Sequence, residues 1–139
     1  MPISYTIKKE QGIIVSKHEG NISDRELVDV YKALFQDPNF RKGYRKLVDL
    51  RSSKSRERSV AALIEVADMV KQYYSGSTET TKTAIVASHD LYFGLARTYE
   101  LISDEYPDEI MVFRDVDKAL EWLGVGPDVL EDIRQVNGS

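Results

Sequence analysis

Apolar residues alternate or gather in five short segments of the chain, as they do in β-strands. The segments span residues 3–8, 13–18, 46–50, 83–87 and 110–113. Glu10-Gln11-Gly12 separates the first two, and a glycine there permits the positive φ of a tight hairpin. We therefore expect an antiparallel pair at the start. Residues 83–87 are apolar on both faces, which is typical of a strand inside a parallel sheet.

Between these segments, apolar residues recur at steps of three and four, the spacing of one helical face. Four helices are expected, and the third is expected to end at Pro107. Their apolar faces are formed by Leu27, Val30, Tyr31, Leu34 and Phe35; by Val60, Leu63, Ile64, Ala67, Val70 and Tyr74; by Leu91, Leu95, Tyr99, Ile102 and Tyr106; and by Val116, Ala119, Leu120 and Leu123. Ser23 and Glu26 form a capping-box pattern at the start of the first helix, and Gly124 ends the fourth.

The order of these elements predicts an α/β fold. Two strands come first, and then each helix separates one strand from the next, which implies right-handed crossovers and a parallel arrangement. We expect one domain with a mixed five-stranded sheet over residues 1–124. Residues 125–139 are expected to form a short helical extension that packs on the same domain or trails from it.

Several segments carry a resemblance to a known family. Lys46-Leu47-Val48-Asp49-Leu50-Arg51 resembles the third strand of the STAS domain of bacterial anti-anti-sigma factors, which also ends near an aspartate. Ala84-Ile85-Val86-Ala87, Phe93-Gly94-Leu95-Ala96-Arg97 and the stretch 112–124 are similar to the SpoIIAA-like family of small bacterial proteins. The likeness covers nearly the whole chain, but its residues are mostly core positions and helix caps.

The resemblance implies a non-enzymatic module, because the family is similar both to STAS regulators and to CRAL-TRIO lipid-transfer domains. Three alternatives follow from it: a phosphorylation switch, a pocket for an apolar ligand, and association with a membrane surface. Anti-anti-sigma factors carry an Asp-Ser dipeptide at the start of the helix after the third strand, and this chain contains no Asp-Ser. The serines of the corresponding stretch are Ser52, Ser53, Ser55 and Ser59.

Composition narrows the class of protein. The 139 residues are 42% hydrophobic and 30% charged, which is ordinary for a globular domain. The chain has no cysteine, which suits a reducing compartment. It shows no basic start followed by an apolar run and no run of about 18 apolar residues. We expect a cytoplasmic protein, with peripheral contact at the inner membrane face left open.

Charge is distributed unevenly. Residues 41–58 hold eight Lys/Arg against Asp49 and Glu57, a net charge of +6, whereas the whole chain carries -4. The remainder is therefore at -10, so attraction to anions is expected only at one patch, and nucleic acid is not an expected partner. Within this stretch Arg51, Lys54, Arg56 and Arg58 could hold a phosphate or a lipid head group. The alternative is a solvated surface loop.

Aromatic residues gather on the second and third helices. A ligand cavity between these helices would use Tyr73, Tyr74, Tyr92 and Phe93, with His89 beside it. Core packing is the alternative, but the adjacent pairs Tyr73-Tyr74 and Tyr92-Phe93 cannot both point inward on one helix. One member of each pair is expected to face water, a partner or a ligand.

The sequence gives little support for a catalytic site or a metal-binding site. Ser88-His89-Asp90 has the residue types of a hydrolase triad, but three consecutive side chains cannot form its line of proton transfer, and they fit a helix start. His18 and His89 are far apart and neither has a carboxylate at ligand spacing, and no glycine pattern indicates a nucleotide cofactor. We predict no catalytic residue, no metal and no cofactor.

The leading hypothesis is a binding module for an apolar or amphipathic, lipid-like small molecule, with the basic stretch favouring anionic head groups. The second is a protein-interaction regulator controlled by phosphorylation of a serine. The sequence leaves the protein partner and the oligomeric state open, a homodimer included.

Overall fold

The computed structural model describes residues 3–54, 58–103 and 108–130. They form one five-stranded sheet in which the strands lie side by side in the order in which they occur in the chain. The strands are β1 (Ile3–Lys8), β2 (Ile13–Gly20), β3 (Arg45–Ser53), β4 (Thr81–Val86) and β5 (Asp108–Phe113). β1 pairs with β2 in the antiparallel sense, and the other neighbours are parallel. The predicted α/β fold with a mixed sheet is confirmed.

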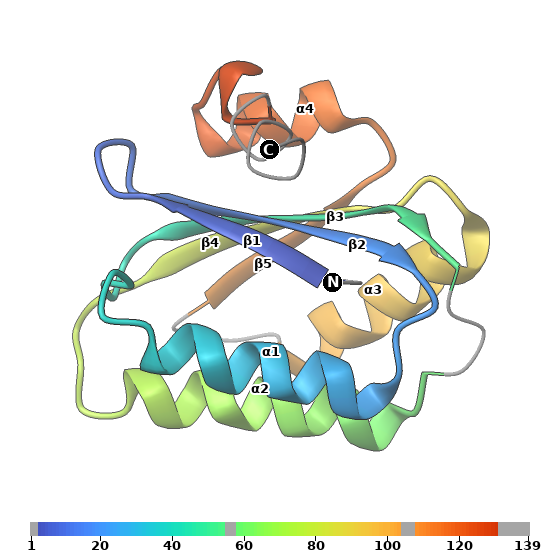
Figure 1. Ribbon diagram of the computed structural model, residues 1–139, viewed down its shortest axis with the longest axis horizontal. Helices are drawn as coiled ribbons and strands as arrows, with labels where there is room; N and C mark the ends of the chain where they lie inside the picture. The colour runs from blue at the N-terminus through green and yellow to red at the C-terminus, as the bar shows by residue number, and fades with distance from the viewer. Residues whose placement is uncertain (1–2, 55–57, 104–107, 131–139) are drawn as a thin grey trace.

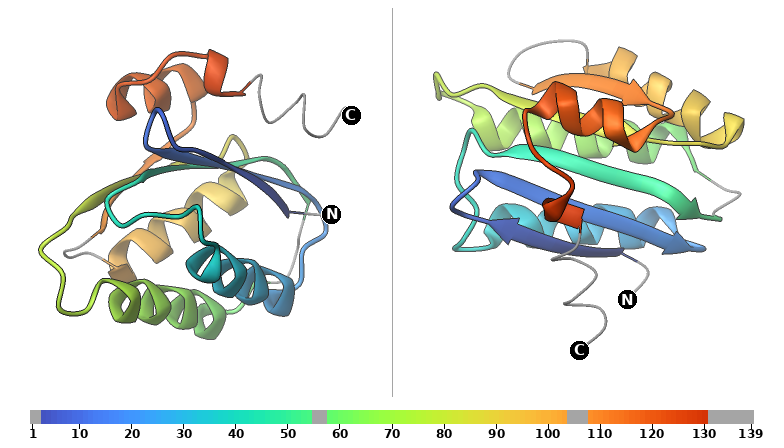
Figure 2. Two further views of the ribbon diagram at one scale, coloured as in Figure 1. Left: turned by 60° about the vertical axis from the view of Figure 1, so that its left-hand side comes forward. Right: turned by 90° about the horizontal axis from the view of Figure 1, so that it is seen from above.

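Four helices cover the two faces of the sheet unequally. They are α1 (Asp24–Gln36), α2 (Val60–Tyr74), α3 (Asp90–Ser103) and α4 (Val116–Leu123). α1, α2 and α3 lie on one face, and α4 lies alone on the other (Figures 1 and 2). Because α1 to α3 each return the chain from the end of one strand to the start of the next parallel strand, they all run in the same direction.

Local signals explain where the elements begin and end. Gly12 has φ of 64° in the turn between β1 and β2, a conformation that other residues adopt only with strain. At the start of α1, Ser23 accepts a hydrogen bond from the Glu26 backbone, and Glu26 accepts one from the Ser23 backbone, so the predicted capping box is present. Gly124 is left-handed and closes α4 by donating to two carbonyls of its last turn.

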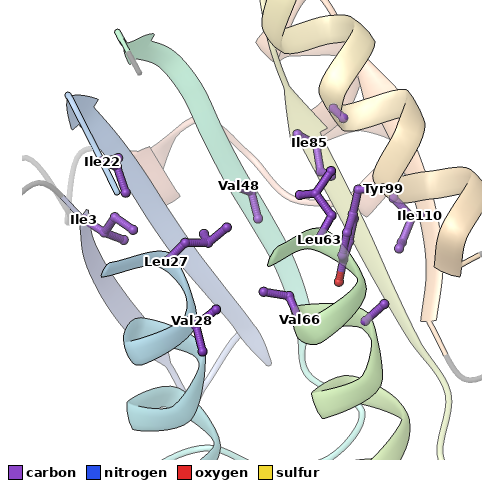
Figure 3. Close-up of a cluster of buried hydrophobic side chains, with 12 residues drawn as sticks. Ile3, Ile22, Leu27, Val28, Val48, Leu63, Val66, Ile85, Tyr99 and Ile110 are labelled. Atoms are coloured by element: carbon purple, nitrogen blue, oxygen red, sulfur yellow. The ribbon is translucent and has the colours of Figure 1, made fainter. Parts of the chain in front are cut away.

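Two main apolar clusters lie on opposite sides of the sheet. The cluster beneath α1, α2 and α3 includes Val48 of β3 and Ile85 of β4. Figure 3 shows Leu63, Ile85 and Tyr99 close together between α2, β4 and α3. The cluster under α4 is formed by alternate strand residues, such as Leu47 and Val86. Burying one such side chain contributes about 1.5–3 kcal/mol, so both faces stabilise the sheet.

The third strand is longer than the sequence indicates. The apolar pattern ends the third strand at residue 50, and the residues that follow are polar, but β3 continues to Ser53. Ser52 and Ser53 pair with Glu19 and Gly20 of β2, after an irregularity in that ladder. Backbone pairing with the extended end of β2 therefore keeps this polar segment in the sheet.

The chain after α4 returns to the core over its described residues. Val129 is fully buried and belongs to the cluster under α4. The expected helical extension also includes residues 131–139, which lie outside the described residues, as does the expected end of the third helix at residues 104–107. Within the part that is described, no helix is both long and apolar enough to cross a bilayer.

Candidate functional site

A cavity of about 80 Å³ lies between the sheet and the helices α1, α2 and α3 and communicates with solvent. Its walls are mainly apolar and come from every neighbouring element: Leu27, Val48, Leu63, Val66, Ile85 and Ala96 are among them. Tyr92 and Leu95 contribute from the beginning of α3. The cavity thus lies between the second and third helices, the place that the sequence suggested for a ligand.

Three polar side chains gather at the end of this cavity that lies toward the carboxyl ends of β2 and β3. His18 comes from β2, Ser53 is the last residue of β3, and Arg58 precedes α2. His18 and Ser53 are each 5% exposed. The cavity therefore combines an apolar body with a polar end, which is the usual composition of a small-molecule site.

His18 is neutral at physiological pH. The pKa of His18 is lowered from 6.5 to about 4, mainly by burial and also by the nearby positive charge of Arg58, whereas Asp49 acts in the opposite direction. A neutral imidazole offers one hydrogen-bond donor and one acceptor. His18 can therefore donate a hydrogen bond to a polar ligand group or accept one from it.

Arg58 is held in place by α1. Its Nη1 donates to Asp24 Oδ1 at 2.8 Å and its Nη2 donates to the Ile22 carbonyl at 3.1 Å. Ser59 caps α2 by accepting from the Ala62 backbone, and its hydroxyl donates to Asp24 Oδ2 at 2.8 Å. Burial would raise the pKa of Asp24, but the hydrogen bonds from Ser59 and Arg58 outweigh burial and lower it. Asp24 thus links α1 to the start of α2.

A second buried polar group lies deeper under the helices. Lys46 Nζ is 3.5 Å from Asp108 Oδ2, and both side chains are 4% exposed. Thr83 donates to the other oxygen of Asp108 at 2.8 Å. Lys46 also lines a cavity of about 20 Å³ that shares His18 and Tyr31 with the larger one. Burial raises the pKa of Tyr31, so its phenol stays protonated.

The five residues predicted to bind the ligand do not form one site. Of Tyr73, Tyr74, His89, Tyr92 and Phe93, only Tyr92 lines the cavity. Tyr73 stacks on Phe35 and Phe40 at centroid distances of 4.6 and 5.2 Å. Tyr74 is buried, and its hydroxyl accepts a hydrogen bond from the Gly43 backbone. This pair belongs to an aromatic cluster at the far end of α2.

His89 and Phe93 lie outside the cavity, at the start of α3. His89 is exposed, and its ring is 6.3 Å from that of Tyr92. The Arg114 guanidinium lies 4.2 Å from the centre of the Phe93 ring and 2.8 Å from Asp90. The Ser88-His89-Asp90 segment is exposed and has no triad geometry in this arrangement. Asp90 is engaged by Arg114 instead of orienting His89.

Two of the four predicted anion-binding residues are paired with carboxylates. Arg51 makes a bidentate contact with Asp49, with two hydrogen bonds of 2.9 Å. That hydrogen bonding raises the pKa of Arg51. Arg58 is paired with Asp24, Lys54 is exposed, and Arg56 lies outside the described residues. These side chains do not form one open cationic patch over the described residues.

The four candidate serines have different surroundings. Ser52 is exposed, Ser53 is buried in the cavity wall, and Ser59 is exposed at the cap of α2. Ser55 lies outside the described residues. Among the described residues, no group of three potential metal ligands occurs.

The position of His18 in the cavity wall was not predicted from the sequence. The sequence spacing raised His18 only as a metal ligand, and it placed Arg58 with the surface cations. The alternation of side chains along β2 is a local signal for His18, because residues 14, 16 and 18 face the same side of the sheet. The identity of that side as the one covered by α1 to α3 requires the three-dimensional structure.

The fold is similar to that of a solved structure. An uncharacterized protein from the DUF3478 family with a SpoIIAA-like fold, from Shewanella loihica PV-4, superposes with a TM-score of 0.54 and 17% sequence identity. The match covers 87% of this chain and 93% of that protein. No family model and no curated protein matches the chain. The comparison shows a SpoIIAA-like fold, as the sequence resemblance implied.

Proposed function

We propose that the protein is a non-enzymatic binding module that holds a small apolar or amphipathic molecule in the cavity between the sheet and α1 to α3. The observation that carries this proposal is the cavity itself, which has apolar walls and three polar side chains at one end. Protein interiors are normally close-packed, so a solvent-connected space among core residues is a candidate binding site.

The volume of the cavity limits the size of its ligand. A ligand that enters the space removes its own apolar surface and that of the walls from water, which contributes about 25 cal/mol per Å². An apolar cavity of about 150 Å³ binds benzene, so this cavity suits a ligand, or the end of a ligand, with only a few carbon atoms.

Size and charge together restrict the lipid-like hypothesis. A complete long-chain lipid is far larger than the cavity, so only the end of such a molecule would fit without movement of the helices. Binding to an anionic membrane receives less support, because Arg51 and Arg58 are already paired with Asp49 and Asp24. We therefore place the cavity ahead of the basic stretch as the functional feature.

A cavity-filling substitution tests this proposal. Ala96 of α3 is 4% exposed and lines the cavity, and the Ala96→Leu change should occupy the space. With 1-butanol as the probe, NMR shifts of the Val66 methyl groups should appear in the wild type and disappear in this variant. The matched control is Ala61→Leu, because Ala61 is exposed on α2. If neither 1-butanol nor butanoate shifts the Val66 methyl signals in the wild-type protein, the proposal fails.

A serine-controlled interaction is the second candidate, and the position of Ser59 favours it. Ser59 is exposed, caps α2 and donates to Asp24 at 2.8 Å. A phosphate on Ser59 would put two anions side by side and break this link between α1 and α2. Mass-spectrometric mapping of protein purified from its native cells should then find the phosphate on Ser59. Uniformly unmodified protein from all growth conditions would count against this function.

A further inference from the structure

His18 is the most unusual polar group in the cavity. Its side chain is 5% exposed and faces the cavity, and no protein group within the described residues forms a hydrogen bond with its imidazole. Buried polar groups in folded proteins are nearly always hydrogen-bonded. The two ring nitrogens therefore offer one donor and one acceptor to a molecule in the cavity.

Arg58 presents further donors to the same space. Its side chain is 9% exposed and lines the cavity, while its contacts with Asp24 and the Ile22 carbonyl use one N–H of each terminal nitrogen. A guanidinium has five N–H donors, so three remain beyond these two bonds. Arg58 is thus held by one carboxylate and still able to bind another.

The charges around His18 occur as opposite pairs. Arg58, which precedes α2, is paired with Asp24 of α1, and Asp49 of β3 is paired with Arg51. The other titratable groups that face the cavity are the phenols of Tyr31 on α1, Tyr92 on α3 and Tyr99 on α3. The smaller cavity that His18 also lines adds Tyr5 of β1 and Lys46 of β3, and Lys46 is paired with Asp108 of β5. An incoming carboxylate would add one negative charge to this balanced set. A buried unpaired charge is unfavourable, and a proton on His18 would compensate for it.

We propose that the natural ligand is a small carboxylic acid with a short apolar chain, that its carboxylate lies between His18 and Arg58, and that binding is accompanied by the uptake of one proton by His18. This inference rests on the proposed function of the cavity. At neutral pH the acid is ionised in solution, so the proton comes from the solvent. The volume restricts the apolar part to about three or four carbon atoms, by comparison with the cavity that holds benzene.

Butanoate and 1-butanol form a matched pair of probes, because they share a chain and differ in charge. The chain has two histidines, so the NMR titration of their ring protons reports His18 and His89 separately. Saturating butanoate should raise the pKa of His18 from about 4 to a value above 7, and 1-butanol should leave it in place. The affinity for butanoate should fall up to tenfold per pH unit between pH 5.5 and 7.5, as expected for the uptake of one proton.

Substitutions of His18 and Arg58 test whether these two residues cause the pH-dependent binding of butanoate. His18→Gln should weaken butanoate binding by about tenfold and remove its pH dependence, while His89→Gln, at the exposed histidine, should behave as the wild type. Arg58→Lys keeps a charge opposite Asp24 but loses the planar fork of donors, and it should weaken butanoate more than 1-butanol. Because these variants keep the charge or the polarity of the site, circular dichroism should show that they fold.

The outcomes separate this inference from the proposed function. If 1-butanol binds as well as butanoate and the pKa of His18 does not move, the carboxylate inference is overturned and the cavity proposal stands. If decanoate binds far more tightly than butanoate, the ligand is the end of a longer chain and the size limit is overturned. If neither probe binds to the wild-type protein, both proposals fail.

Discussion

The buried histidine should make stability depend on pH. Above pH 6.5, His18 is neutral in both the folded and the unfolded state and contributes no pH dependence. Below pH 6.5 the unfolded chain takes up a proton, whereas the folded protein resists it because the pKa of His18 is lowered to about 4. The free energy of unfolding therefore decreases as the pH falls from 6.5 to 4.

The magnitude follows from the size of the shift. Each pKa unit corresponds to about 1.36 kcal/mol, so a shift from 6.5 to about 4 amounts to roughly 3 kcal/mol once the pH is below 4. At pH 5 the loss should be about 2 kcal/mol. The His18→Gln substitution removes the titrating group and should abolish this part of the pH-dependent loss in the free energy of unfolding.

Urea unfolding at pH 7 and pH 5 measures the effect. Other carboxyl groups also titrate in this range, so the informative quantity is the change between the two pH values in the wild type minus the same change in His18→Gln. We expect about 2 kcal/mol for this difference, with an unchanged dependence on urea concentration. His89→Gln is the control and should lose as much stability as the wild type. Equal pH dependence in wild type and His18→Gln would refute the assignment of a buried neutral imidazole.

Three further substitutions test contacts and backbone conformations that stabilise the fold, each by urea unfolding. Lys46→Met leaves Asp108 buried without its partner and should cost about 3–5 kcal/mol, while adding Asp108→Leu should restore most of that loss. Ser59→Ala removes the cap of α2 and should cost about 1 kcal/mol, in contrast to a nearly neutral Ser52→Ala at an exposed position. Gly124→Ala forces a left-handed conformation at φ of 75° and should cost about 1–2 kcal/mol.

The fold could be predicted from local signals because they are strong and mutually consistent. The capping box at Ser23 and Glu26, the turn at Gly12 and the end of α4 at Gly124 are all encoded within a few residues. Helical and strand periodicity then supply the element order. The length of β3 could not be obtained this way, because Ser52 and Ser53 stay in the sheet through pairing with β2.

The aromatic ligand site could not be assembled correctly from sequence spacing alone. Tyr73 and Tyr74 stand at the end of α2, whereas Tyr92 and Phe93 stand at the beginning of α3. Both helices run in the same direction, so these pairs lie at opposite ends of the layer, separated by about the 22 Å length of a 15-residue helix. Parallel connection implies this separation, which is the reason that Tyr73 and Tyr74 do not reach the cavity that Tyr92 lines.

The basic stretch shows why a count of charges along the chain overstates an electrostatic surface. Arg45 donates to the carbonyls of Leu123 and Gln11, and Lys46 is paired with Asp108 inside the core. Both contacts join residues that are far apart in the sequence.

Arg58 makes a contact of the same kind with Asp24, whereas Arg51 is paired with Asp49 two residues away in β3. Three of the eight cations in residues 41–58, Arg45, Lys46 and Arg58, therefore help to hold the sheet, α1, α2 and α4 together. Arg58 also lines the cavity beside His18, so this cation takes part both in a contact that holds two helices together and in the wall of the candidate site.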